Sequence, residues 1–131
     1  MKKYVLALTI SLIGLFSCKS TGLKDLYDLD MRESLTIHSN VNEEIKLKVT
    51  SNPTTGYDWF TNYDESNEFI EVQSSFQSIS NEKEIVGAPS YKIYKIKGLK
   101  TGKYTIILDY KRGWETGVSP IKEKTIEINV K

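Results

Sequence analysis

The side chains that carry out most enzyme chemistry are scarce in this chain, which has one histidine, His38, and one cysteine, Cys18. Histidine is the commonest general acid or base, but a single histidine in a strand-like segment is far more often packed or solvent-exposed than catalytic. The carboxylates offer no better candidate, because Asp64–Glu65, Glu82 and Glu84 lie in polar segments typical of solvated loops. We therefore expect no enzyme activity and assign no catalytic residue.

The same residue counts argue against several other classes of protein. One cysteine cannot form an internal disulfide, and one cysteine with one histidine cannot complete the ligand shell of a structural zinc site. The 18 Lys and Arg residues almost balance the 17 Asp and Glu residues, whereas nucleic-acid binding needs a clustered basic face. We expect no metal, no cofactor and no nucleic-acid partner. A length of 131 residues suits one small domain.

The position of the cysteine suggests its chemistry. Two lysines precede the uncharged run Tyr4–Ser17, whose apolar core of about a dozen residues suits a secretory signal and is shorter than the roughly 20 residues that span a bilayer. Leu15–Cys18 resembles the bacterial lipobox, in which the cysteine is lipid-modified and becomes the new N-terminus, although Phe16 is bulkier than usual. The alternative is a signal cleaved nearby, with Cys18 as an ordinary small residue.

We therefore predict three parts: a lipoprotein signal peptide over residues 1–17, the lipidated Cys18 with a polar tether over residues 18–33, and a folded domain over residues 34–131. The protein would be exported and lipid-anchored to the bacterial cell envelope, on the periplasmic or the outer surface. Acyl chains on Cys18 would hold it there, since each buried methylene contributes about 0.8 kcal/mol.

The elements that follow have the period of β-strands. Polar and apolar residues alternate most clearly over 44–49, 104–110 and 125–130, and more weakly over 35–39, 57–61, 69–76 and 91–97. About seven short strands, separated by turn residues every dozen positions or so, are typical of a β-sandwich. We predict an all-β fold, an immunoglobulin-like β-sandwich of about seven or eight strands. Tyr104, which follows the turn at Gly102, fits the tyrosine corner of such folds.

Strand alternation then groups the most distinctive segments. If seven successive strands alternate in direction, the connections 51–56, 77–89 and 111–119 emerge at the same end of the sandwich. In the first of them, Pro53 fixes its own φ, Gly56 allows unusual backbone angles and the threonines between them can form local hydrogen bonds, which predicts a stiff turn. Arg112 and Trp114 in the third are residue types enriched at interface hot spots.

Three motifs in these connections resemble those of one family. Asn52–Tyr57, followed by Trp59, resembles the signature of the chagasin-like inhibitors of papain-like cysteine proteases, which fold as immunoglobulin-like sandwiches. Val86–Ser90 resembles the family's glycine-rich second loop, with Ser90 where a further glycine is usual. Arg112–Glu115 resembles its Arg-Pro-Trp motif, with Gly113 replacing the proline. The resemblance covers about residues 35–130.

This resemblance implies a reversible inhibitor, expected to be a monomer, that inserts three loops into the active-site cleft of a papain-like cysteine protease. The segment around Pro53–Gly56 would lie nearest the protease thiolate, Gly87–Ser90 along the non-primed side, and Trp114 on the primed side with Arg112 bracing it. The protease-binding residues would be Asn52, Pro53, Thr54, Thr55, Gly56, Tyr57, Gly87, Ala88, Pro89, Ser90, Arg112, Gly113 and Trp114.

Two points stay open from the sequence. Tyr57 and Trp59 begin a strand, so we expect them mainly to pack beneath the first loop. Because sandwiches of this class host many functions, the alternative is an envelope-tethered adhesion or complex-assembly module that uses the same loops to bind a partner protein or a glycan.

Overall fold

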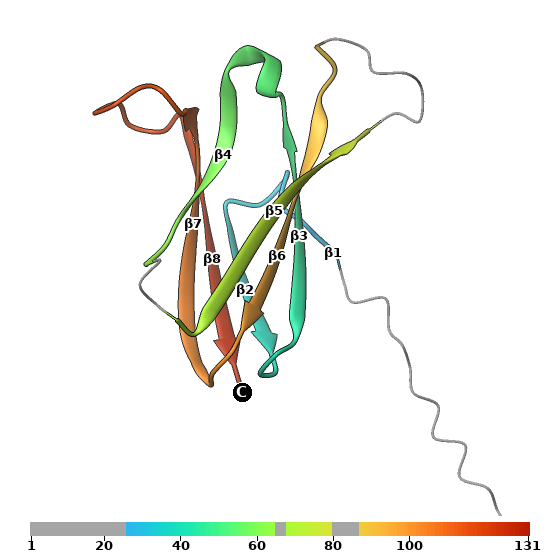
Figure 1. The fold of residues 1–131 in the computed structure, drawn as a ribbon, viewed down its shortest axis with the longest axis vertical. Coiled ribbons are helices and arrows are strands. Elements are labelled where there is room, and N and C mark those ends of the chain that lie inside the picture. The colour runs from blue at the N-terminus through green and yellow to red at the C-terminus, as the bar shows by residue number, and fades with distance from the viewer. Residues whose placement is uncertain (1–25, 65–67, 80–86) are drawn as a thin grey trace, which may run out of the picture.

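The computed structural model describes residues 26–64, 68–79 and 87–131, and within them the chain forms two packed β-sheets (Figure 1). The strands are β1 (Leu26–Asp28), β2 (Ser34–Ser39), β3 (Glu44–Ser51), β4 (Tyr57–Asn62), β5 (Ile70–Ser78), β6 (Ser90–Gly98), β7 (Gly102–Arg112) and β8 (Lys122–Val130). A single 3₁₀ turn, η1 (Pro53–Thr55), is the only helical element of the described residues. The all-β sandwich expected from the alternation is confirmed.

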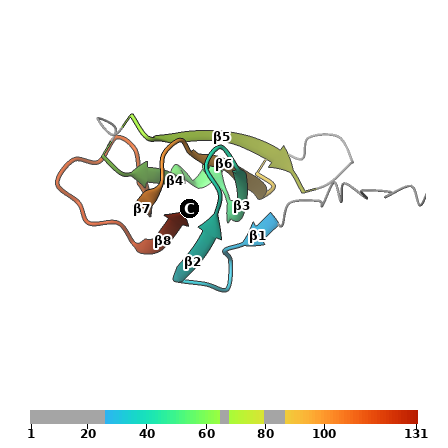
Figure 2. The same cartoon turned by 90° about the horizontal axis from the view of Figure 1, so that it is seen from below.

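Each sheet has four strands. One has the order β1-β3-β6-β5 and the other the order β2-β8-β7-β4. The pairs β1–β3 and β2–β8 are parallel, and the remaining pairs are antiparallel. Seen from below in Figure 2, β5 and β4 form the edge strands on one side, and β1 and β2 those on the other.

Inward-facing alternate residues of both sheets make the core. On β3 these are Ile45, Leu47 and Val49, and on β7 they include Ile106 and Leu108, all of which are buried. Burying each such side chain contributes about 1.5–3 kcal/mol relative to exposure. The hydroxyl of Tyr104 donates a hydrogen bond of 2.7 Å to the carbonyl of Lys100, so the predicted tyrosine corner is present.

The expected start of the folded part is wrong in one respect. The sequence pattern places residues 26–33 in the polar tether, but Leu26–Asp28 form β1 along the edge of β3. Leu29 is 1% exposed, and the Lys124 ammonium donates to the carbonyls of Leu29 and Arg32, both at 2.6 Å. This segment is too short and too polar to show a strand period, yet the side chains of Tyr27 and Leu29 and its backbone carbonyls hold it on the sandwich.

The signal peptide and Cys18 lie outside the described residues. Within the described part of the chain, no helix is long and apolar enough to cross a membrane.

Candidate functional site

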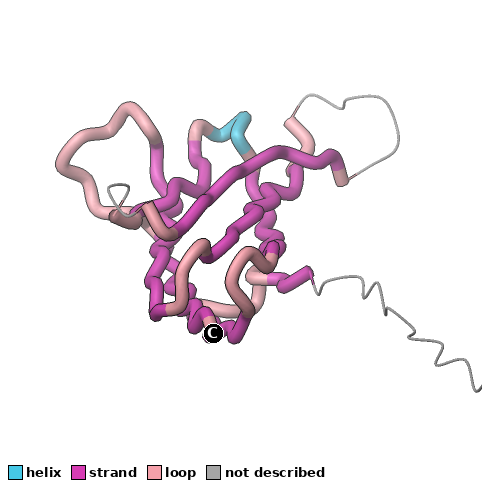
Figure 3. The backbone as a smooth tube through the Cα atoms, turned by 60° about the horizontal axis from the view of Figure 1, so that its bottom comes forward, coloured by secondary structure: helices cyan, strands magenta, loops and turns pink. Residues whose placement is uncertain are grey.

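The three distinctive connections emerge at one end of the sandwich, called here the loop end, as the strand parity predicted. Figure 1 shows the β7–β8 and β3–β4 connections at the top together with the end of β5 and the start of β6, and Figure 3 shows the short helix η1 between the β7–β8 connection and these two strand ends. We name their described parts the first loop (Asn52–Gly56), the second loop (Gly87–Pro89) and the third loop (Gly113–Ile121).

The first loop is a stiff turn made by its own hydrogen bonds. The backbone N–H of Thr55 and its hydroxyl both donate to the carbonyl of Asn52, at 3.1 and 2.7 Å, and the Thr54 hydroxyl donates to the Asn52 side chain at 2.5 Å. Gly56 closes the turn with a φ of +82° and donates to the carbonyl of Pro53 at 2.9 Å. A left-handed φ at this position favours glycine, so the sequence prediction of a rigid turn holds.

Below the turn, β3 and β4 are tied together although they belong to different sheets. The indole N–H of Trp59 donates to the carbonyl of Thr50 at 3.0 Å, and the Ser51 hydroxyl donates to the carboxylate of Asp58 at 2.9 Å. Trp59 is 3% exposed and tilts against Tyr110, with ring centroids 4.8 Å apart. Trp59 therefore has the packing role expected of it.

The third loop begins with a tight turn braced by Arg112. The N–H of Glu115 donates to the carbonyl of Arg112 at 3.3 Å, and the Arg112 guanidinium contacts the Glu115 carboxylate at 3.4 Å. The same guanidinium lies 4.5 Å from the centre of the Tyr57 ring and 6.0 Å from that of Trp114. Arg112 thus links the base of the first loop to the start of the third.

Trp114 is 69% exposed, but it is not free of the protein. Its six-membered ring lies directly on Gly56, where a Cβ atom added to the glycine would collide with the indole. The first and third loops therefore touch before any partner binds. Sequence reasoning placed Trp114 only against a partner and missed this contact, although a glycine beside a motif tryptophan is the kind of close approach that could have suggested it.

The second loop does not join this contact network. Gly87 has a φ of +90°, and apart from its chain neighbours no atom of the described residues lies within 4 Å of where its Cβ would be. Ser90 is the first residue of β6 and pairs with Ser51 and Ser78, so it has strand geometry rather than the positive φ that a glycine there would allow. The substitution of glycine by Ser90 therefore costs no backbone strain.

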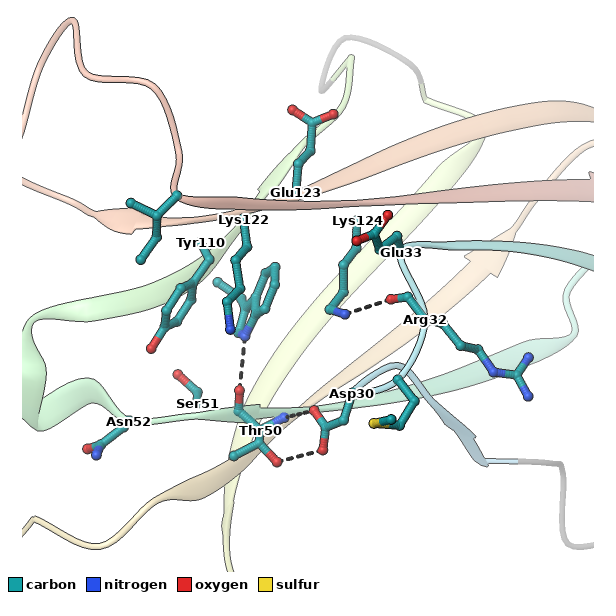
Figure 4. Close-up of a pocket in the computed structure, with 13 residues that line it drawn as sticks. Asp30, Arg32, Glu33, Thr50, Ser51, Asn52, Tyr110, Lys122, Glu123 and Lys124 are labelled. Carbon is teal, nitrogen blue, oxygen red and sulfur yellow. Dashed lines mark hydrogen bonds between the residues drawn. The ribbon is translucent and has the colours of Figure 1, made fainter.

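A pocket of about 860 Å³ lies on one flank beneath the first loop (Figure 4). Two of its charged groups are bound by the protein itself: the carboxylate of Asp30 accepts from the N–H and hydroxyl of Thr50, both at 2.7 Å, and the ammonium of Lys124 donates to backbone carbonyls. Burial lowers the pKa of Lys124. These contacts hold the β1–β2 link against the end of β3 and so support the first loop from below.

The described residues do not assemble a metal centre, since no three His, Cys, Asp or Glu side chains among them are grouped to hold an ion. His38 is exposed on β2, where it is opposite Asn129 in the parallel ladder. The arrangement is that of an immunoglobulin-like sandwich presenting a rigid, exposed turn and an exposed tryptophan at one end, which defines a protein-binding scaffold.

The family is given by comparison with known proteins. Residues 39–130 match the model of the chagasin family of peptidase inhibitors (I42), and the chain belongs to this family. It is 31% identical over 114 residues to amoebiasin-2 of Entamoeba histolytica, an alignment that covers 87% of this chain and 92% of that protein. Family membership favours the inhibitor over the adhesion module that the sequence left open.

Solved structures of protease inhibitors have a similar fold. The crystal structure of the cysteine protease inhibitor EhICP2 from Entamoeba histolytica matches with a TM-score of 0.62 and 29% identity, covering 81% of this chain and 95% of that one. The Leishmania mexicana ICP structure matches with a TM-score of 0.52 and 29% identity, covering 86% and 93%.

Proposed function

We propose that this protein is a reversible inhibitor of papain-like cysteine proteases that inserts the three loops into the active-site cleft. The observation that carries the proposal is the first loop: a self-bonded turn at the loop end, with the Trp114 ring packed on Gly56, in a chain of the chagasin family. Amoebiasin-2 and the inhibitor EhICP2 are the relatives that support the target class.

The geometry of the first loop explains how it would obstruct a protease without being cut. A substrate is cleaved when an extended peptide is held against the thiolate, whereas Pro53–Thr55 form a 3₁₀ turn and Gly56 is left-handed. No peptide bond of the turn then has the geometry of a scissile bond. Because the turn is already formed, little conformational entropy is lost on docking.

The second and third loops would lie on either side of the first loop in the protease cleft. Gly87–Ser90 would lie along the non-primed side through backbone contacts, which the open space around Gly87 permits. The exposed face of Trp114 would pack on the primed side, while Arg112 keeps the tryptophan and the first loop in register. Tryptophan and arginine are the residue types most enriched at interface hot spots.

The proposal is tested by an inhibition titration. The chain from residue 18 onward, carrying Cys18→Ser, is titrated against papain and related cathepsins. We expect stoichiometric, reversible loss of protease activity, weakened about 30-fold or more by Trp114→Ala, the size of a hot-spot loss. Phe69→Ala is the matched control, because Phe69 is also exposed but precedes β5 at the opposite end. No inhibition at micromolar concentrations by the unsubstituted chain would remove the inhibitor function.

We also propose that the protein is exported as a bacterial lipoprotein, with residues 1–17 removed as the signal peptide and Cys18 lipidated, so that the inhibitor is anchored to the cell envelope. The support is the sequence itself, in which the sole cysteine directly follows the apolar run. Mass spectrometry of the native N-terminus tests this: an acylated Cys18 is expected, and an unmodified N-terminus at another residue would contradict it.

A further inference from the structure

Two aromatic side chains on neighbouring edge strands remain exposed close to the loop end. Phe60 on β4 is 36% exposed and Phe76 on β5 is 53% exposed. Both rings lie near the Lys92 ammonium, whose distance is 5.5 Å to the centre of the Phe60 ring and 5.1 Å to that of Phe76. The two rings therefore flank one point at the edge where the two sheets face each other.

Phe76 is exposed although it lies on the inner face of its sheet. Alternation along β5 places Ile70, Val72, Ser74 and Phe76 on the same face, and the first two pack in the core. Ser74 and Phe76 are exposed instead, although they lie on this inner face. The sandwich is thus open along this edge. We call Phe60, Ser74 and Phe76 the open-edge patch.

Lys92 lies beneath the patch, but its ammonium adds no unpaired charge to the patch. The Lys92 ammonium is bound by the carboxylate of Asp58 and by the carbonyl of Trp59, both at 2.6 Å, and Lys92 is 7% exposed. The surface offered to a partner therefore consists mainly of two aromatic rings, with the Ser74 hydroxyl between the strands and the Lys111 ammonium 5.9 Å from the centre of the Phe60 ring. Exposed apolar patches of this kind on a small soluble protein usually mark binding sites.

The patch is continuous with the loops. Phe60 is the fourth residue of β4, Phe76 is two residues before the end of β5, and both strands meet the loops at that end. At about 3.3 Å per residue the patch begins within about 10 Å of the loop bases. Phe60 also touches the third loop, since a Cβ at Gly113 would lie 3.0 Å from its ring.

We infer that the open-edge patch is a second contact with the same protease. An apolar surface beside the active-site cleft of the enzyme would pack on the patch, and this contact would determine which protease complexes dissociate most slowly. This rests on the proposed inhibitor function. A partner that encloses all three loops must approach the sides of the sandwich directly below them.

The test uses two variants of the Cys18→Ser chain, Phe76→Gln and the control Phe69→Gln. For each variant, the dissociation rate of its complexes with proteases and its inhibition constant are measured. Phe69 has a similar exposure, 44%, but precedes β5 at the opposite end. We expect Phe76→Gln to weaken inhibition about tenfold for at least one of papain and two cathepsins, and Phe69→Gln to change it less than about twofold. Ser74→Arg, which adds bulk to the patch without removing a packed group, should weaken inhibition as well.

Unchanged inhibition by both Phe76→Gln and Ser74→Arg, with the unsubstituted chain inhibiting normally, would overturn the inference and leave the inhibitor function standing. Sedimentation of the free chains gives the other decisive result. A concentration-dependent dimer that Phe76→Gln abolishes without any change in inhibition would mean that the patch binds a second copy, and would overturn the inference too. If the chain that carries only Cys18→Ser does not inhibit any of these proteases, the proposed function and the inference are both overturned.

Discussion

At the scale of single residues, the first and third loops are one unit. The Tyr57 ring stacks on Tyr110 with centroids 5.6 Å apart, the Arg112 guanidinium also contacts the Tyr57 ring, and Trp114 covers Gly56. The chain of contacts fixes the orientation of the exposed indole before binding. Pre-ordering of this kind raises affinity by reducing the entropy lost in the complex.

A substitution at Gly113 can increase the conformational order of the third loop in the free protein. The hydrogen bond from the Glu115 N–H to the Arg112 carbonyl makes residues 112–115 a turn with Gly113 at its second position, where proline is favoured. Gly113→Pro should stabilise the chain by about 0.4–1 kcal/mol through the unfolded state and tighten inhibition about twofold to fivefold. Denaturant unfolding and the inhibition constant measure the two effects.

The Phe60 ring is the neighbour that a proline at position 113 meets, since a Cβ there would lie 3.0 Å from its tip. The ring must move by a few tenths of an ångström, which a flexible side-chain tip can do. Gly117→Ala is the comparison, because Gly117 has a φ of +74° and a side chain there is strained. Weaker inhibition by Gly113→Pro, at unchanged stability, would show that the third loop must move on binding.

The sequence predicts the local conformation of the first loop better than the contacts between the loops. The stiffness of Asn52–Gly56 follows from local composition, because proline, glycine and hydroxyl side chains act within a few residues. The packing of Trp114 on Gly56 joins positions 58 residues apart, and no local pattern encodes it. The open edge beside Phe76 was missed for the same reason, since alternation predicts an inward side chain but not whether the other sheet covers it.

At the scale of elements, β1 shows the limit of pattern reading. The seven other strands are six residues long or longer and were predicted, whereas β1 has three residues and one half-buried side chain. Its position depends on tertiary partners: Asp28 contacts Lys48 at 2.7 Å, and Leu29 fills the core. The sequence pattern assigns such a segment to the tether because the contacts that attach it to the sandwich are non-local.

The Asp28–Lys48 pair makes the attachment of β1 sensitive to pH. The hydrogen bond from Lys48, and after it that from the Asp30 N–H, lower the pKa of Asp28. A lowered carboxylate pKa stabilises the fold above the unfolded value of about 3.9, and this stabilisation is lost as the pH falls through the folded value. Asp28→Asn should therefore lower the free energy of unfolding at pH 7 by less than about 1 kcal/mol, because the pair is solvent-screened.

Urea unfolding at pH 7 and at low pH measures this difference. We expect the gap between Asp28→Asn and the unsubstituted chain to close below the folded pKa of Asp28. Glu127→Gln is the control, an exposed carboxylate on β8. An Asp28→Asn gap that is the same at both pH values would mean that the side chain acts through packing rather than through its charge.

At the scale of the whole molecule, the chain enters the sandwich away from the loops. Leu26 is opposite Lys46 near the start of β3, and the first loop follows the end of β3 at Asn52. Six residues of strand separate the two levels, about 20 Å at 3.3 Å per residue. The segment from Cys18 to Leu26, fully extended, reaches at most about 28 Å. An anchor at Cys18 would therefore attach the protein to the membrane through the edge of the sandwich, at a level about 20 Å along β3 from the first loop.

This geometry predicts that anchoring leaves inhibition intact. A chain coupled through Cys18 to a lipid in neutral phosphatidylcholine vesicles should inhibit soluble papain with the same inhibition constant, within about threefold, as the free Cys18→Ser chain. A chain coupled instead through a cysteine placed at Thr54, in the first loop, should lose inhibition, because the membrane then covers the loop end. If coupling at Cys18 abolishes inhibition as well, the loops do not clear the membrane, and the lipoprotein would have to be released from its anchor to act.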